Sequence, residues 1–225
     1  MPIGTLNEGP LHASLKAAYS ANGGEEEVAM EGFVADAVRG GIVYEIQTGS
    51  FSGLGRKMKS LADAGPVVLV HPIARDTFIL KQGDDPEAKP LSRRKSPKHG
   101  ALVHIVRELV YIPTLLNHPN FSVEVVLTDE EEVRVYDPKM RRRRGGWRVI
   151  ERRLLEIVEG RRLSDTAELF DFAREELPEV FGTKELAQAI GQPVALARQM
   201  AYCLREAGVT ELCGKKGNAL QYRCS

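Results

Sequence analysis

Apolar residues recur at helical or strand spacing along the first eighty residues of the chain. Leu11, Leu15 and Tyr19 stand at i, i+4 and i+8, the stripe of a short amphipathic helix. The stretch "GGIVYEIQTG" is rich in β-branched and aromatic residues and predicts a strand. The expected order is therefore α-β-β-β-α-β: a helix at 11–20, a strand region at 26–38 with a weak point at Gly32, a strand at 42–48, a helix at about 54–64, and a buried strand at 67–70 that ends at His71-Pro72.

The pattern changes after residue 80. A stretch dense in Pro, Gly and charge predicts a polar loop at 81–100, with a short strand "TFIL" just before it. The expected elements that follow are a helix near 101–111, a strand at 121–127, an exposed loop at 137–148 and a helix at 150–159. These patterns divide the chain into a core at 1–100, a basic middle region at 101–174 packed on that core, and a small domain at 175–225.

The composition is that of a globular protein, with 43% hydrophobic and 28% charged residues. No apolar run approaches the roughly 20 residues of a membrane span, and the N-terminus lacks the features of a secretion signal. Three cysteines without CxxC spacing predict reduced thiols in the cytoplasm, not a disulfide frame or a zinc site. No GxxxxGK[ST], GxGxxG or GxSxG motif is present, which argues against nucleotide-driven and serine-hydrolase chemistry.

The zero net charge hides a local basic excess. Residues 89–153 carry 15 Lys and Arg against 8 Asp and Glu, a net charge of +7, whereas residues 1–88 have a net charge of −5. A basic excess confined to the middle of the chain indicates a surface that faces a polyanion.

Two carboxylates are expected to meet on neighbouring strands. A two-residue turn at Gly40-Gly41, which double glycine favours, pairs residues whose numbers sum to 81, so that Asp36 lies opposite Glu45. Opposed carboxylates either raise a pKa or hold a cation, and oxygen ligands from two strands suit Mg²⁺. The alternative is that both carboxylates are solvated on an open face of the sheet.

This arrangement resembles the PD-(D/E)XK nuclease superfamily, which has the restriction-endonuclease-like fold. The resemblance rests on the α-β-β-β-α-β order and on Asp36 and Glu45 with their spacing, and it covers about residues 10–80. The segments "GFVADAV", "YEIQTGSFSGLGRKMKSL", "VVLVHPIA" and "SRRKSPKHG" are also similar to an uncharacterised bacterial family with an EIQT signature, and this likeness extends over most of the chain. The fold implied is α/β, with a central mixed sheet.

The resemblance implies a role for each site residue. Asp36 and Glu45 would ligate Mg²⁺ or Mn²⁺, which would polarise a scissile phosphate. The superfamily usually has a lysine two residues after the glutamate, where this chain has Gln47, a candidate catalytic residue whose carboxamide would orient a water but supplies no positive charge. Lys57 on the following helix is the candidate for the missing cation, and Glu27, or alternatively Glu8, for a further acidic ligand. His12 and Lys16 on the first helix either face phosphate or are surface residues.

Two basic tracts and the C-terminal segment predict contacts with DNA. The tract at 92–100 and the tract at 139–148 combine phosphate-binding cations with Trp147, which is able to stack on an unpaired base. The alternative is a solubilising loop with Trp147 in the core. The predicted DNA-binding residues of these tracts are Arg93, Arg94, Lys95, Lys98, Arg141, Arg142, Arg143, Arg144 and Trp147.

The segment 181–223 predicts helix, turn, helix and hairpin, and it resembles a winged helix-turn-helix. Its second helix, with Gln192, Arg198, Gln199 and Arg205 on or near it, would enter the major groove, and Lys215 and Lys216 would belong to the wing. The alternative for this segment is a protein-interaction or dimerisation domain.

Two hypotheses about function result. The first is a metal-dependent DNA endonuclease of repair, recombination or defence, for which cleavage of both strands would favour a homodimer. The second is a catalytically degenerate nuclease fold that binds DNA or regulates without cutting it.

Overall fold

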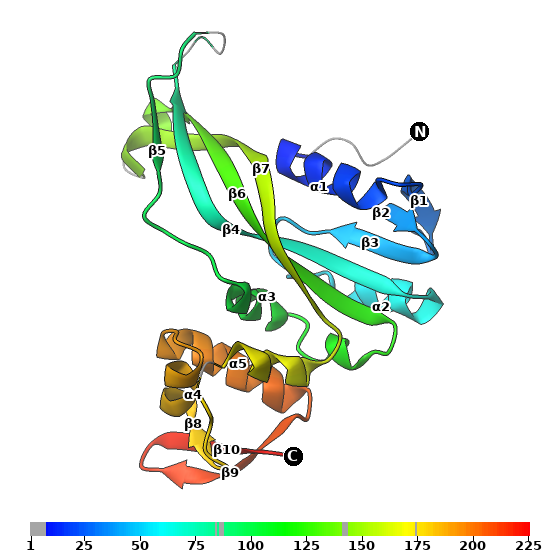
Figure 1. Cartoon of the computed structure of the whole chain (residues 1–225), viewed down its shortest axis with the longest axis vertical. Helices are drawn as coiled ribbons and strands as arrows, with labels where there is room; N and C mark the ends of the chain where they lie inside the picture. The colour runs from blue at the N-terminus through cyan, green and yellow to red at the C-terminus, as the bar shows by residue number, and fades with distance from the viewer. Residues whose placement is uncertain (1–7, 84, 86–87, 141–143, 174) are drawn as a thin grey trace.

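The fold is built around one large mixed β-sheet, in a computed structural model that describes residues 8–83, 85, 88–140, 144–173 and 175–225. Its strands lie in the order β1, β2, β3, β4, β6 and β7, while β5 pairs with the second half of β4 (Figure 1). The bounds are β1 Glu25–Met30, β2 Phe33–Arg39, β3 Ile42–Ile46, β4 Val67–Gln82, β5 Ser92–Lys95, β6 Phe121–Tyr136 and β7 Trp147–Leu163.

The predicted order of the first six elements is confirmed. Helix α1 (Pro10–Ser20) precedes the antiparallel strands β1, β2 and β3, and helix α2 (Gly55–Ala64) connects β3 to β4, which runs parallel to β3. Gly40 and Gly41 have φ angles of 58° and 76°, a conformation that glycine adopts without steric cost and that a tight hairpin turn requires.

Strand β4 is much longer than the predicted strand at 67–70, which was expected to end at Pro72. It runs through Pro72 to Gln82 and remains paired with β6 along this length. Its pairing with β3 ends at Val70, so Pro72 lies where β4 has lost one neighbour, and a missing backbone N–H is tolerated at such an edge. The predicted loop at 81–100 also contains a strand, β5, which pairs with Phe78–Lys81.

The helix predicted at 150–159 is wrong, because this segment lies in the middle of β7. Glu, Arg and Leu are good helix formers, but β7 pairs with β6 from Tyr136 and Trp147 to Val123 and Leu163. Ion pairs of Arg152 with Glu130 and of Arg162 with Glu124 join the two strands. Partners distant in the sequence therefore override the local propensity of this segment.

The sheet carries a helix on each face of its first half. Leu11 and Leu15 of α1 pack with apolar residues of β2, β3, β4 and β6 on one face. Met58 and Leu61 of α2 pack on the other face, in a larger core. Asp36 and Glu45 thus belong to strands held between two helices, and this packing fixes their positions.

The C-terminal segment forms the predicted helix, turn, helix and hairpin. The short helices η1 (Leu102–Ile105) and α3 (Val106–Leu109), near the predicted helix at 101–111, lie between it and the large sheet (Figure 1). Its apolar side chains, among them Leu186 and Met200, belong to the same buried core as Met58 and Leu61. Its elements are β8 Phe181–Gly182, α4 Thr183–Ala189, α5 Val194–Glu206, β9 Thr210–Lys216 and β10 Ala219–Cys224.

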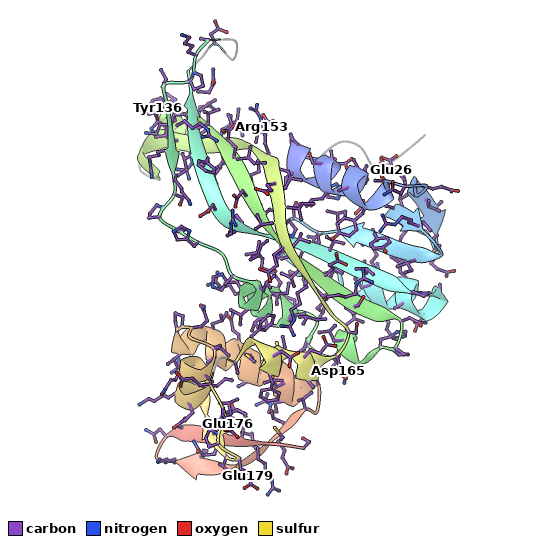
Figure 2. The ribbon with its side chains drawn as sticks, in the orientation of Figure 1. Glu26, Tyr136, Arg153, Asp165, Glu176 and Glu179 are labelled. Atoms are coloured by element: carbon purple, nitrogen blue, oxygen red, sulfur yellow. The ribbon has the colours of Figure 1, made fainter. Side chains whose placement is uncertain are left out.

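The link from β7 to α4 is rich in acidic residues. Asp165 lies where the chain leaves β7, and Glu176 and Glu179 lie beside the C-terminal hairpin (Figure 2). The side chain of Asp165 accepts a hydrogen bond from the Ala167 amide at 2.6 Å and so caps the short helix η5 (Thr166–Phe172). Within the described residues, no helix combines the length and apolarity needed to cross a bilayer.

Candidate active site

Asp36 and Glu45 lie where the hairpin strands β2 and β3 begin to separate. The predicted register holds for the three pairs that connect 37–39 to 42–44, of which Ala37 with Tyr44 is the last. Beyond this pair, the Ile46 amide of β3 bonds to a side chain of β2 instead of its backbone: it donates a hydrogen bond to Asp36 Oδ2 at 2.7 Å. The carboxylate of Asp36 is therefore fixed at the end of β3, next to Glu45.

Glu45 is a buried carboxylate with one oxygen paired and the other unpaired. Its side chain is 8% exposed, and its Oε1 forms an ion pair with the Lys57 ammonium from α2. Lys57 also donates a hydrogen bond to the Val34 carbonyl at 3.0 Å, which holds the ammonium beside β2. Glu45 Oε2 is buried and has no hydrogen-bond partner among the described residues. A buried oxygen without a partner is costly, and it marks a place for a missing cation or donor.

The two carboxyl groups have pKa values displaced in opposite directions. Burial and the charge of Asp36 raise the pKa of Glu45 to about 7, because the attraction of Lys57 offsets them only in part. Burial alone would raise the pKa of Asp36 as well, but hydrogen bonds from His12 and from the Ile46 amide, together with the positive charges nearby, lower it. Asp36 is therefore ionised at neutral pH, while Glu45 is near its midpoint.

Helix α1 contributes a chain of polar contacts that the sequence reasoning missed. His12 Nε2 lies 3.3 Å from Asp36 Oδ2, and its Nδ1 lies 2.7 Å from the Glu8 carboxylate. The Lys16 ammonium lies 2.8 Å from the Glu8 carboxylate and 3.2 Å from the Glu27 carboxylate, and so links the two. His12 and Lys16 stand at i and i+4 on α1, a signal that they share one helix face, and Glu8 lies just before the helix.

Two other predicted site residues lie apart from the carboxylate pair. The Gln47 side chain donates a hydrogen bond to the Ser50 backbone carbonyl at 2.8 Å. The backbone carbonyl of Gln47 accepts a hydrogen bond from His71 Nδ1 at 2.7 Å. Glu27 has a side chain that is 48% exposed and paired with Lys16. The structure therefore brings together Asp36, Glu45 and Lys57, joined by His12 from α1.

The donors present fit a divalent cation with few protein ligands. Within the described part of the chain, no group of three or more His, Cys, Asp or Glu side chains could hold a metal ion. Mg²⁺ commonly takes one or two carboxylates and keeps several waters, so Asp36 and the unpaired Glu45 Oε2 are an appropriate set.

Residues 9–164, which contain α1 and the whole large sheet, match the family described as "Domain of unknown function (DUF8091)". The chain belongs to this family.

One relative extends the comparison beyond the part that matches the DUF8091 family. A protein of Treponema pallidum (strain Nichols), described as uncharacterized, is 32% identical over 224 residues, which is 99% of this chain and 88% of the relative. The similarity therefore covers the segments that form both the large sheet and the C-terminal helices of this chain. No solved structure matches this chain at a significant level.

The two basic tracts of this DUF8091 protein meet at one end of the large sheet, away from Asp36 and Glu45. Lys81 of β4 lies over the Trp147 ring at 4.3 Å, at the start of β7. Glu45 pairs with Leu69 on β4. Strand β5, which belongs to the first tract, begins to pair with β4 at Phe78, roughly 30 Å further along the strand. Arg93, Arg94 and Lys95 of β5, and Trp147 of β7, thus lie far from the carboxylates on the same sheet.

Several of the predicted DNA-binding cations are already paired with carboxylates. Arg93 contacts Glu131 at 2.8 Å and Lys95 contacts Asp76 at 2.8 Å, whereas the Arg94 guanidinium reaches a backbone carbonyl. Trp147 is half-buried against Tyr136 with ring centroids 5.8 Å apart, so its ring is partly covered. Arg141, Arg142 and Arg143 lie outside the described residues, and Arg144 lies in a short helical turn before β7.

The C-terminal cations gather around a separate cavity. Arg198 of α5, Lys184 of α4 and Lys216 of the hairpin line a space of about 540 Å³, and Lys215 is exposed beside them. Gln192 does not belong to this group, because its Oε1 contacts His104 at 3.2 Å and so joins the start of α5 to the body of the protein.

Proposed function

We propose that this protein is a metal-dependent nuclease that hydrolyses phosphodiester bonds in DNA. The observation that carries the proposal is Glu45 Oε2, a buried carboxylate oxygen without a partner, beside the ionised Asp36. The order α1-β1-β2-β3-α2-β4, with β3 and β4 parallel, supports a restriction-endonuclease-like core around this pair. The succession α4, α5, β9 and β10 supports a winged helix that contributes Arg198 and Lys216 to DNA binding.

Each group of the site has a role in this proposal. Asp36 and Glu45 would hold Mg²⁺ or Mn²⁺, which when bound supplies Lewis-acid stabilisation of the charge on the scissile phosphate. The Ile46 amide and His12 keep Asp36 ionised and fix the position of its carboxylate. Lys57 supplies the positive charge that Gln47 lacks. Its ammonium, now paired with Glu45, would contact a phosphate oxygen or orient the attacking water.

A second function is favoured by the ion pair between Lys57 and Glu45. The Lys57 ammonium pairs with one oxygen of Glu45, and the Gln47 side chain is hydrogen-bonded to Ser50, so the chain's own side chains neutralise the site. A core of this kind would bind DNA through its basic surfaces and regulate its use without cutting it.

Cleavage assays separate the two functions. Wild-type protein is incubated with supercoiled, linear, single-stranded and branched DNA in Mg²⁺, Mn²⁺ or EDTA, beside the variants D36A and E45A. The matched control is E25A, which removes an exposed glutamate from β1. The nuclease proposal expects cleavage that requires metal, is lost in D36A and E45A, and persists in E25A. Metal-independent DNA binding without cleavage of any substrate would overturn it and support the second function.

A further inference from the structure

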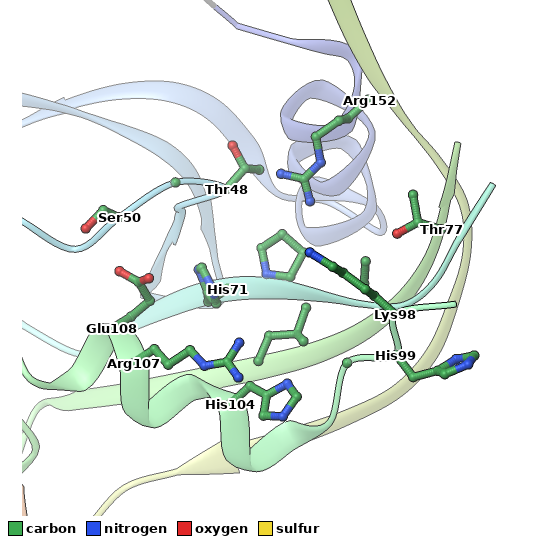
Figure 3. A pocket seen from close by; sticks show the side chains of 15 residues that line it. Thr48, Ser50, His71, Thr77, Lys98, His99, His104, Arg107, Glu108 and Arg152 are labelled. Atoms are coloured by element: carbon green, nitrogen blue, oxygen red, sulfur yellow. The ribbon is translucent and has the colours of Figure 1, made fainter. Parts of the chain in front are cut away.

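A polar cavity of about 760 Å³ opens beyond the C-terminal end of β3, separate from the carboxylate pair. Its walls come from five segments that are distant in the sequence: 48–50, 71–77, 98–100, 104–108 and Arg152 of β7 (Figure 3). Thr48 follows Glu45 by three residues, so the cavity begins at most about 11 Å from Glu45 along the backbone. None of the roles proposed for Asp36, Glu45 and Lys57 uses this space.

The cavity has an excess of positive charge. Lys98 and Arg107 extend into it from opposite walls (Figure 3), and neither side chain has a carboxylate partner among the described residues. Arg152 also lines it but is held by the buried Glu130 through two hydrogen bonds of 2.9 and 2.7 Å. Glu108, the carboxylate among the lining residues, accepts a hydrogen bond from the Phe51 amide at 2.9 Å. Lys98 and Arg107 are therefore available for an anion.

The wall that carries Lys98 is fixed in place before any ligand binds. The Ser96 amide donates to the Thr77 carbonyl at 2.7 Å, and the Gly100 amide donates to the Arg75 carbonyl at 3.1 Å. A Cβ at Gly100 would lie 2.3 Å from the Ala74 carbonyl oxygen, so glycine allows this segment to approach β4 closely. A preorganised cation loses less entropy when it binds an anion.

The remaining lining is uncharged and suits a flat, partly polar group. Burial lowers the pKa of His71, and its Nδ1 donates to the Gln47 carbonyl, so the neutral ring keeps Nε2 as an acceptor. Burial likewise lowers the pKa of His104. Pro72 and Ile73 add apolar surface, and Thr48, Ser50 and Thr77 add hydroxyl groups.

We propose that this cavity binds a nucleoside monophosphate group. Lys98 and Arg107 contact the phosphate, while the imidazoles and the apolar wall contact the base and sugar. A volume of about 760 Å³ exceeds what a bare phosphate fills and lies within the range of roughly 300–1,000 Å³ typical of small-molecule sites. The same chemistry comes from a free mononucleotide or from the 5′-phosphorylated end of a strand. Binding here requires no cleavage at Asp36 and Glu45.

Calorimetry on the full chain in EDTA tests the proposal without any activity. The probes are thymidine and adenosine 5′-monophosphates, orthophosphate, and a short oligonucleotide with either a 5′-phosphate or a 5′-hydroxyl. The variants are K98A and R107A, both exposed positions, with K89A as a matched control: an exposed lysine outside the cavity. Thermal melts establish that each variant is folded.

The expected result is saturable nucleotide binding that K98A and R107A each weaken about 10-fold or more and that K89A leaves unchanged, because each of the first two variants removes a charged hydrogen-bond donor to the phosphate. A preference for the 5′-phosphorylated oligonucleotide over its hydroxyl form assigns the strand end as the source, and equal affinity for both forms assigns the free nucleotide. Absence of saturable nucleotide binding, orthophosphate binding as tight as nucleotide binding, or no effect of K98A and R107A would overturn the proposal. Each of these results is independent of cleavage.

Discussion

Replacing Glu45 with glutamine removes a buried carboxyl group whose pKa is raised to about 7 from an ordinary value of 4.5. Between these two pH values the unfolded chain has lost the proton of this group and the folded chain has kept it. The folded state therefore binds more protons, and the stability of the wild-type protein falls as pH rises through this window. Glutamine has nearly the same shape but no proton to lose, so this fall in stability with pH should be absent from E45Q.

The magnitude follows from the displacement of the pKa. Each pKa unit corresponds to about 1.4 kcal/mol, so ionising Glu45 costs the folded state about 3 kcal/mol once the pH is above 7. The free energy of unfolding of wild type minus that of E45Q should thus decrease by about 3 kcal/mol between about pH 4 and about pH 8. Any constant contribution, such as the altered contact with Lys57, cancels in this comparison across pH.

Urea unfolding followed by circular dichroism in EDTA measures this difference. E25Q is the matched control, because Glu25 is exposed on β1 and its replacement should give a curve parallel to that of wild type. Added Mg²⁺ should reduce the loss in wild type and leave E45Q unchanged, since a ligand that binds the ionised folded form stabilises it. A difference between wild type and E45Q that stays constant with pH would refute the reasoning.

Three further changes have defined outcomes. K57M removes the cation that partly offsets the effect of burial on Glu45, so the pKa of Glu45 should rise above about 7. A carboxyl ¹³C NMR titration measures this pKa, and an unchanged value would contradict the ion pair. Asp36 and Glu8 raise the pKa of His12 in spite of burial. In denaturant titrations, wild type should therefore be more stable than H12Q by its full margin below about pH 6.5, and this margin should disappear as the pH rises through the raised pKa of the folded state. G100A should lower stability by about 1–3 kcal/mol because its Cβ would meet the Ala74 carbonyl, and a thermal melt equal to that of wild type would show that the segment can move away.

Much of the first half of the fold could be predicted from local patterns. The stripe of Leu11 and Leu15 forms the buried face of α1, and Gly40 and Gly41 fix the hairpin register that sets Asp36 beside Glu45. These features depend on a few residues close in the sequence, whose side-chain period and backbone freedom decide the local structure. The same reason explains the success with the helices and hairpin of the C-terminal segment.

The features that the sequence did not reveal depend on contacts between distant segments. Residues 150–159 have helical propensity, and pairing with β6 alone makes them a strand. His12 reaches Asp36 because α1 packs across the sheet, and Lys98 and Arg107 line one cavity because a close approach at Gly100 holds one segment against β4. The sequence by itself determined the element order of the first half, the helices and hairpin of the C-terminal segment, and which carboxylates are neighbours. The tertiary structure decided which cations are paired and where a cavity opens, because ion pairs and cavities are formed by side chains from segments that only packing brings together.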